Sequence, residues 1–214
     1  MSSEPTYTLT IYNETGKLQH FVLIALPDML KPPPDPLSLV WLVGTAAGAD
    51  PAGRSVAVMS WTPTCSVVLG QMREEKGFLT ETALPVKVAA SNSLIASYRG
   101  TFPGGKPILS IAYQAGKPGI TVKTDGIPGA EAQARSGVTL HLGIALEGRA
   151  AMAIPLLPSQ TYEFSTKLRY FLLAGSFAVG RAMVMADLPV YEVMFDGVTD
   201  RTVIFNRQEQ FVPD

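Results

Sequence analysis

Cysteine and histidine are scarce in this sequence, whose 214 residues include one cysteine, Cys65, and two histidines, His20 and His141. A single cysteine cannot form an internal disulfide, and thiolates alone cannot build a metal site here. Two histidines far apart in the chain, with no spaced carboxylate motif beside them, are a weak signal for zinc or iron. The sequence therefore predicts no metal centre and no other bound cofactor.

Charge is also low. Charged residues make up 16% of the chain and the formal net charge is −1, against about 25% charged residues in ordinary soluble domains. The lysines and arginines are scattered, with no basic run. Nothing in this pattern attracts nucleic acid or an anionic membrane surface, so neither is an expected partner.

Targeting and membrane-spanning segments are not evident either. The start, "MSSEPTYTLT", lacks the basic-then-apolar pattern of a signal peptide. The most apolar run, "YFLLAGSFAVGRAMVMA", contains Arg181 and two glycines, and it is shorter than the ~20 residues a spanning helix needs. We expect a buried pair of strands there, no membrane span and a cytoplasmic location.

What the sequence has in quantity is turn residues, 19 glycines and 17 prolines. They cluster in runs such as "LPDMLKPPPDP" and "DGIPG", and short apolar segments lie between the runs. No window keeps a 3.6-residue apolar period, and only "GAEAQARSG" could form two turns of helix. The pattern predicts one all-β domain over residues 1–214, an antiparallel β-sandwich. The expected strands are 6–12, 19–26, 38–46, 54–61, 66–71, 80–88, 93–98, 107–113, 119–124, 138–146, 150–156, 161–165, 168–176, 189–195 and 199–206.

Four of the expected strands are apolar on both faces: "FVLIAL", "LVWLVG", "VAVMSW" and "YFLLAG". An outer face of a two-sheet sandwich is normally polar. Loops or distant parts of the chain could cover the second face of these strands. Alternatively, that face could form a homodimer interface or line a ligand cavity.

Several segments resemble the RhiA-type family, named for a rhizosphere-induced bacterial protein. "YTLTIYNET" resembles its first strand, with a Y-x-L-x-x-x-N start, and "FLTETALPVKVAASNSLIASYRGTF" is similar to its middle segment. The run from "GVTLHLGIAL" through "YEFSTKLRYFLLAGSF" resembles its most recognisable part, although Arg181 replaces a residue that is often acidic. The resemblance implies a compact antiparallel β fold and no established catalytic residues, and it suggests small-molecule (secondary) metabolism as a setting.

His141 is the first candidate for chemistry. In "TLHLGIAL" the residues Leu140 and Leu142 alternate with it, so His141 is expected on the opposite face of its strand. Imidazole exchanges protons near neutral pH, which makes it a candidate general acid or base. If that face lines a pocket, His141 could hydrogen-bond a substrate oxygen with Arg169 or Tyr170 nearby. If the face is wet, His141 is an ordinary surface residue.

Aromatic residues on expected strands are the candidate ligand contacts, because an aromatic ring offers an apolar face and, in Tyr and Trp, a polar tip. They are Trp41, Trp61, Tyr113 and Tyr170, with Arg169 beside the last. The same residues could simply be core. The sequence contains no G-x-S-x-G and no phosphate-binding glycine loop before a helix.

The leading functional hypothesis is therefore binding of an apolar small molecule in a pocket of the sandwich. The alternatives are a cofactor-independent cyclase or isomerase acting on an apolar metabolite, which needs no recognisable motif, and a structural or assembly protein. A homodimer is expected from the surplus of apolar strands.

Overall fold

The computed structural model describes residues 5–29, 37–48, 53–73, 77–85, 91–112, 119–184 and 188–214. It confirms the all-β prediction: strands dominate, and the described part of the chain holds one α-helix, α1 (Ala130–Ser136), where "GAEAQARSG" predicted two turns. The strands are β1 (Tyr7–Asn13), β2 (Gln19–Met29), β3 (Leu37–Leu39), β4 (Leu42–Ala46), β5 (Ser55–Trp61), β6 (Cys65–Arg73), β7 (Gly77–Pro85), β8 (Ser91–Arg99), β9 (Lys106–Ile111), β10 (Gly119–Asp125), β11 (Thr139–Leu146), β12 (Arg149–Pro155), β13 (Thr161–Ala174), β14 (Ala182–Met183), β15 (Tyr191–Val193), β16 (Asp200–Phe205) and β17 (Phe211–Pro213).

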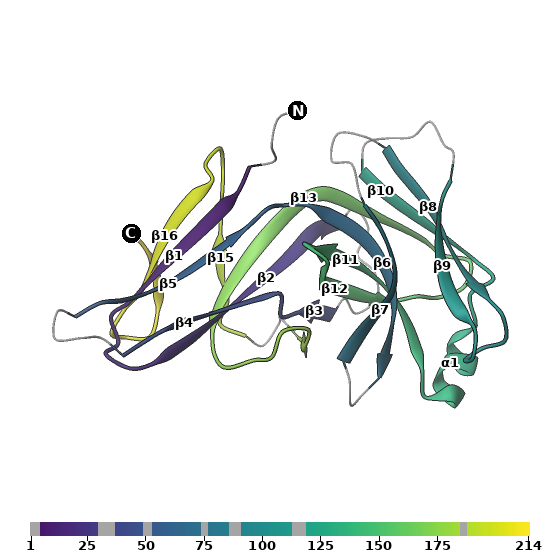
Figure 1. The fold of residues 1–214 in the computed structure, drawn as a ribbon, viewed down its shortest axis with the longest axis horizontal. Coiled ribbons are helices and arrows are strands. Elements are labelled where there is room, and N and C mark those ends of the chain that lie inside the picture. The colour runs from purple at the N-terminus through teal and green to yellow at the C-terminus, as the bar shows by residue number, and fades with distance from the viewer. Residues whose placement is uncertain are drawn as a thin grey trace.

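The strands form three sheets (Figure 1). Their orders are β17-β16-β1-β5, then β4-β2-β13-β10-β8-β9 with β15 also paired to β13, and β14-β3-β12-β11-β6-β7. Most neighbours are antiparallel, as predicted, but β1 pairs in parallel with β16 and β8 with β10. Parallel neighbours need long connections, and alternation within a strand carries no information about such distant partners.

The long strand β13 connects the two ends of the molecule (Figure 1). The sequence predicted two strands, 161–165 and 168–176, but the chain continues as one strand. Its first part pairs with β10 and its second part pairs with β2, and the register with β2 shifts between Phe164 and Leu168. A β-bulge or similar irregularity therefore lies where β13 changes its main partner.

Two large apolar cores lie on either side of this irregularity. One packs β1, β5 and β16 against β2 and the second part of β13, with Phe21, Trp41 and Trp61 at its centre. The other packs β6, β11 and β12 against β8, β9, β10 and the start of β13. Because β13 contributes to both cores, the structure supports the prediction of a single domain, which stays a prediction.

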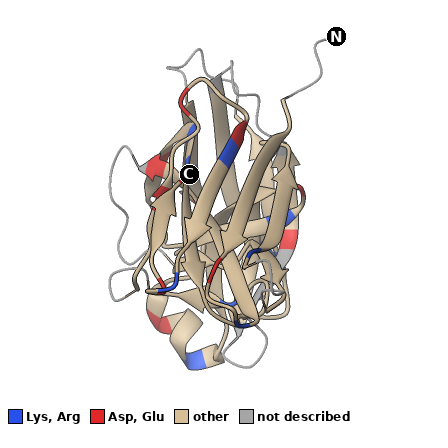
Figure 2. Cartoon of the chain, turned by 90° about the vertical axis from the view of Figure 1, so that its left-hand side faces the viewer, with Lys and Arg blue, Asp and Glu red and all other residues tan. Residues whose placement is uncertain are grey.

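The doubly apolar strands have different explanations. In β2 and β13 the second face is covered by the chain itself: Val22, Ile24 and Leu173 form a third cluster with Val40 and Met183. In β5 the second face is not covered, since Val56 and Val58 are 50% and 58% exposed. Figure 2 shows that the end of the molecule with β1 and β16 carries scattered charges and no cluster of one sign. The homodimer stays a prediction.

Helix α1 is held against the second core by the buried amide of Gln133. Its Nε2 donates to the carbonyl oxygens of Pro128 (2.8 Å) and Leu156 (3.0 Å), and its Oε1 accepts from the Leu140 N–H (2.7 Å). All three bonds satisfy backbone groups that would otherwise be buried without a partner. Gln133 therefore fixes the start of β11, the strand that carries His141.

Candidate functional site

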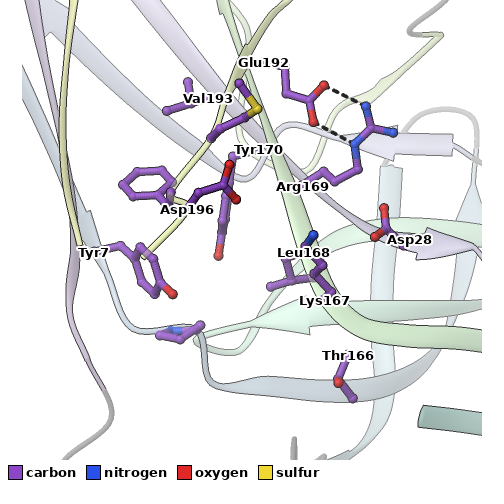
Figure 3. Close-up of a pocket in the computed structure, with 13 residues that line it drawn as sticks. Tyr7, Asp28, Thr166, Lys167, Leu168, Arg169, Tyr170, Glu192, Val193 and Asp196 are labelled. Carbon is purple, nitrogen blue, oxygen red and sulfur yellow. Dashed lines mark hydrogen bonds and ion pairs between the residues drawn. The ribbon is translucent and has the colours of Figure 1, made fainter. Parts of the chain in front are cut away.

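A pocket of about 530 Å³ lies beside the irregular stretch of β13 (Figure 3). It lies within the size range of small-molecule sites. We call it the bulge pocket. It is lined by Tyr7, Asp28, Pro63, Thr166, Lys167, Leu168, Arg169, Tyr170, Glu192, Val193, Met194, Phe195 and Asp196. The lining thus comes from β1, β2, β13, β15 and two connecting segments.

The irregularity in β13 explains why a pocket forms at this place. Thr166 and Lys167 lie between the two registers that β13 makes with β2, opposite Asp28, since Phe164 pairs with Met29 and Leu168 pairs with Pro27. The N–H of Lys167 donates to the Ser165 Oγ at 3.0 Å. Bulges bend a strand and redirect its side chains, and they are common beside binding sites.

One wall of the bulge pocket is aromatic. The rings of Tyr7, Tyr170 and Phe195 contact one another with centroids 5.0–6.2 Å apart. Trp61 packs behind all three, with centroids at 5.1–6.0 Å, and Trp41 packs edge-on against Trp61 at 5.5 Å. The structure thus brings three predicted contacts together: Trp41, Trp61 and Tyr170. The two tryptophans are fully buried behind the wall.

The hydroxyl of Tyr170 stays protonated across the physiological range. Burial raises the pKa of Tyr170 to about 12, while the nearby indole N–H of Trp61 opposes part of this increase. The approach of the two groups does not reach hydrogen-bond geometry, and the buried Nε1 of Trp61 has no partner among the described residues. The indole N–H of Trp61 is thus a donor that lies beside the Tyr170 hydroxyl.

The rim of the pocket carries opposite charges. Arg169 makes a bidentate ion pair with Glu192, with Nε and Nη2 each 2.7 Å from a carboxylate oxygen. This pair lowers the pKa of Glu192 and raises that of Arg169. The guanidinium carbon of Arg169 also lies 5.1 Å from the ring centroid of Phe171. Arg169 lines the pocket, with its charge already matched by a carboxylate, and its role as a ligand contact stays a prediction.

His141 lies outside the bulge pocket. On β11 it pairs with Gly70 and Pro155, and its side chain is 4% exposed. Leu140 and Leu142 belong to the second core and His141 does not, as alternation predicts. The idea of a wet outer face is wrong, because His141, Gly143 and Ala145 are all buried. Burial also lowers the pKa of His141, and a weak contact of Nδ1 with the Thr139 carbonyl oxygen (3.4 Å) only partly opposes this effect.

The buried imidazole predicts a pH-dependent stability. Because the pKa of His141 in the folded state lies below its ordinary value of 6.5, the unfolded chain binds a proton more readily. The contribution of neutral His141 is complete above about pH 6.5 and is lost as the pH falls below it, by at most about 1.4 kcal/mol per pH unit. Urea unfolding of wild type and His141→Gln between pH 5 and 8 measures this.

The control is His20→Gln, because His20 is exposed and its Nδ1 makes an exposed hydrogen bond with the Thr45 Oγ1 at 3.1 Å. We expect His141→Gln to flatten the acidic side of the profile and His20→Gln to keep it. Equal profiles for wild type and His141→Gln would contradict a buried neutral imidazole.

The comparisons with known proteins give one match. The family model for RhiA covers residues 4–213, nearly the whole chain. The protein belongs to the RhiA family. No curated protein and no solved structure shows significant similarity to it. The resemblance inferred from the sequence motifs is thereby confirmed.

The RhiA-like opening motif has a structural explanation in this family member. Tyr7 lines the bulge pocket, and Leu9 is fully buried in the core behind it. Asn13 is also fully buried. Its Nδ2 donates to the carbonyl oxygens of Lys17 (2.8 Å) and Ala47 (3.2 Å), and its Oδ1 accepts from the Thr15 N–H (3.1 Å). The Y-x-L-x-x-x-N motif thus combines a residue that lines the pocket, a residue of the core and an asparagine that holds the turn after β1.

The sequence patterns did not identify several residues that line the bulge pocket, and one predicted contact lies outside the part of the chain that the structure describes. Tyr113 lies outside the described residues. Tyr7 begins the alternating segment "YTLTIYN", a pattern that predicts a half-buried strand but does not show which of its residues line a pocket. Phe195, Lys167 and Asp196 gave no signal, because the irregular stretch of β13 and the turn after β15 determine where they point.

Two further features of the described residues concern metal ions and membranes. No group of three or more His, Cys, Asp or Glu side chains in the described part of the chain could hold a metal ion. In the same residues, no helix has the length and hydropathy needed to cross a bilayer. Cys65 is buried behind the aromatic wall, and its Sγ lies 3.4 Å from the Pro63 carbonyl oxygen.

Proposed function

We propose that this RhiA-family protein is a small-molecule binding protein and that the ligand occupies the bulge pocket. The observation that carries the proposal is the aromatic wall of Tyr7, Tyr170 and Phe195, whose rings pack together on one side of the 530 Å³ pocket. Aromatic side chains with a few polar groups among them are the usual lining of a ligand site. The ligand is expected to be largely apolar, as the sequence predicted, with at least one polar atom.

The position of the pocket also supports binding. It is larger than two further pockets lined by described residues, which have volumes of about 250 and 380 Å³. It lies beside a rigid sheet, on which Tyr170 is 5% exposed and packed in the first core. A ligand that stacks on this wall would not have to open the core.

Binding in this pocket can be followed by the intrinsic tryptophan fluorescence of the protein. Its two tryptophans, Trp41 and Trp61, both belong to the aromatic cluster behind the wall. A panel of small aromatic and alicyclic compounds, first screened by ligand-observed NMR, should contain binders that change the tryptophan emission. The hits should be retested on Thr166→Phe, which places a ring in the pocket from a half-buried position.

We expect Thr166→Phe to weaken binding of the hits by at least about tenfold, which corresponds to ~1.4 kcal/mol. The matched control is Thr10→Phe, a change on the outer face of β1, away from the residues that line the pocket. If the hits bind Thr166→Phe as tightly as wild type, or if no compound binds at millimolar concentration, the bulge pocket is not a ligand site.

A cofactor-independent cyclase or isomerase remains the second prediction. It would need a proton-transfer group other than His141, which is not among the residues that line the bulge pocket. Tyr7, Tyr170 and Asp196 are the polar groups on or near the aromatic wall that could act on a bound molecule. The cytoplasmic location and the setting in secondary metabolism stay predictions as well.

A further inference from the structure

The Tyr and Trp side chains at the aromatic wall can donate hydrogen bonds, whereas the nearby carboxylate of Asp196 accepts them. Burial keeps Tyr170 protonated, and Trp61 Nε1–H can only donate. If Trp61 donates to the Tyr170 oxygen when the site is occupied, the Tyr170 hydroxyl hydrogen is left for a ligand. Figure 3 shows the hydroxyl ends of Tyr7 and Tyr170 pointing into the same part of the pocket. A ligand that matches these groups must offer an acceptor oxygen or nitrogen there.

The charges at the rim do not favour an anion as that acceptor. Two cations, Lys167 and Arg169, line the pocket together with three carboxylates. Arg169 is matched by Glu192 in the bidentate pair. Of the charged residues that line the pocket, this leaves one cation, Lys167, and two carboxylates, Asp28 and Asp196. The rim therefore offers no surplus of positive charge. A carboxylate ligand would meet two further carboxylates, whereas an uncharged acceptor would not.

The packing of the rings offers no cage for a cationic ligand. Quaternary ammonium groups are held most strongly where several aromatic rings surround them, with the nitrogen within about 6 Å of each ring centre. The rings of Tyr7, Tyr170 and Phe195 have centroids only 5.0–6.2 Å apart, so they fill the space between themselves. They do not form a cage. Because Phe195 stands nearly perpendicular to both tyrosine rings, at 86° and 78°, a planar group can stack on one ring and meet the next ring edge-on.

We propose that the bulge pocket binds a neutral, planar ring compound that carries a carbonyl group, with the carbonyl oxygen accepting a hydrogen bond from the Tyr170 hydroxyl. The ring stacks on one aromatic ring of the wall and meets another edge-on, beside the apolar side chains of Leu168 and Val193. This inference rests on the proposed function and specifies the ligand class for the same pocket.

Three probes of similar shape test the ligand class: 2-acetylnaphthalene, 2-ethylnaphthalene and 2-naphthoate. Their binding to the full chain is measured by equilibrium dialysis. The ketone should bind about tenfold more tightly than the hydrocarbon, because only the ketone offers an acceptor to the buried donors. It should also bind more tightly than the carboxylate.

The substitution Tyr170→Phe removes one oxygen atom and keeps the ring. It should reduce the preference for the ketone over the hydrocarbon to about one, with the affinity for the hydrocarbon unchanged. The matched control is Tyr191→Phe on β15, since the Tyr191 ring packs on Phe211 and does not line the bulge pocket. Circular dichroism melting of both variants checks that each remains folded.

Three results would overturn the inference: equal affinity for ketone and hydrocarbon, tighter binding of the carboxylate, or a ketone preference that persists in Tyr170→Phe. If none of the three probes binds while the screening hits are still excluded by Thr166→Phe, the ligand class is wrong and the binding function stands. If Thr166→Phe excludes no compound at all, both proposals fall together.

Discussion

Replacing Trp61 by alanine is expected to lower the free energy of unfolding by about 3–5 kcal/mol, the range for removing a large aromatic side chain from a core. The Trp61 side chain is 1% exposed and contacts the rings of Trp41, Tyr7, Tyr170 and Phe195. These rings belong to β1, β13 and the segments beside β3 and β15, so alanine would leave a cavity where four parts of the chain meet. Urea unfolding followed by far-ultraviolet circular dichroism measures the loss.

Two further variants separate the loss of the aromatic ring from the general effect of a substitution on this strand. Trp61→Phe keeps a ring and also removes the buried N–H that has no described partner, so it should cost clearly less than alanine. Val58→Ala is the control on the same strand, because Val58 is 58% exposed, and it should change stability by less than about 0.5 kcal/mol. If Trp61→Ala costs no more than Val58→Ala, the aromatic cluster is not a packed core.

The strands could be predicted because glycine and proline mark their ends. Between these marks, the alternation of Leu9 and Ile11 with Thr8 and Thr10 predicts the buried face of β1, and the structure buries both Leu9 and Ile11. The join within β13 could not be predicted, since "STKL" reads as a break between two strands although the chain passes through it with a local irregularity. The cover on the second face of β2 also gave no signal, because it combines Val40 with Met183, which lies more than a hundred positions further along the chain.

The candidate site was predictable where a residue type alone carries information. Trp41, Trp61 and Tyr170 were candidates because large aromatic residues gather in cores and pocket walls, and the structure places all three in one cluster. His141 was a candidate because imidazole can transfer protons. The chemistry of a side chain, however, does not show where the fold places that side chain. Its strand is covered on both faces. Which aromatic residue meets solvent in the bulge pocket depends on tertiary packing that a linear pattern does not contain.

The centre of "TLHLGIAL" offers a second sharp prediction, at Gly143. In β11 this glycine pairs with Ala153 of β12 and Val68 of β6. A Cβ added at Gly143 would lie far inside contact distance of the Met152 carbonyl oxygen and 3.1 Å from Cγ2 of Val68. A backbone carbonyl in the middle of a sheet cannot rotate away as a side chain can, so strands β11 and β12 would have to separate locally.

We therefore expect Gly143→Ala to destabilise the protein by about 3 kcal/mol, at the upper end of overpacking effects in cores. The control is Gly104→Ala, an exposed position where the nearest atom to an added Cβ, the Thr101 carbonyl oxygen, lies at an ordinary 3.6 Å. That change should alter stability by less than about 0.5 kcal/mol. Thermal and urea unfolding of both variants give the comparison. In Gly143→Ala, hydrogen exchange should become faster at the amides of β11 and β12. If the two variants are equally stable, this pair of strands is not as close as the structure places it.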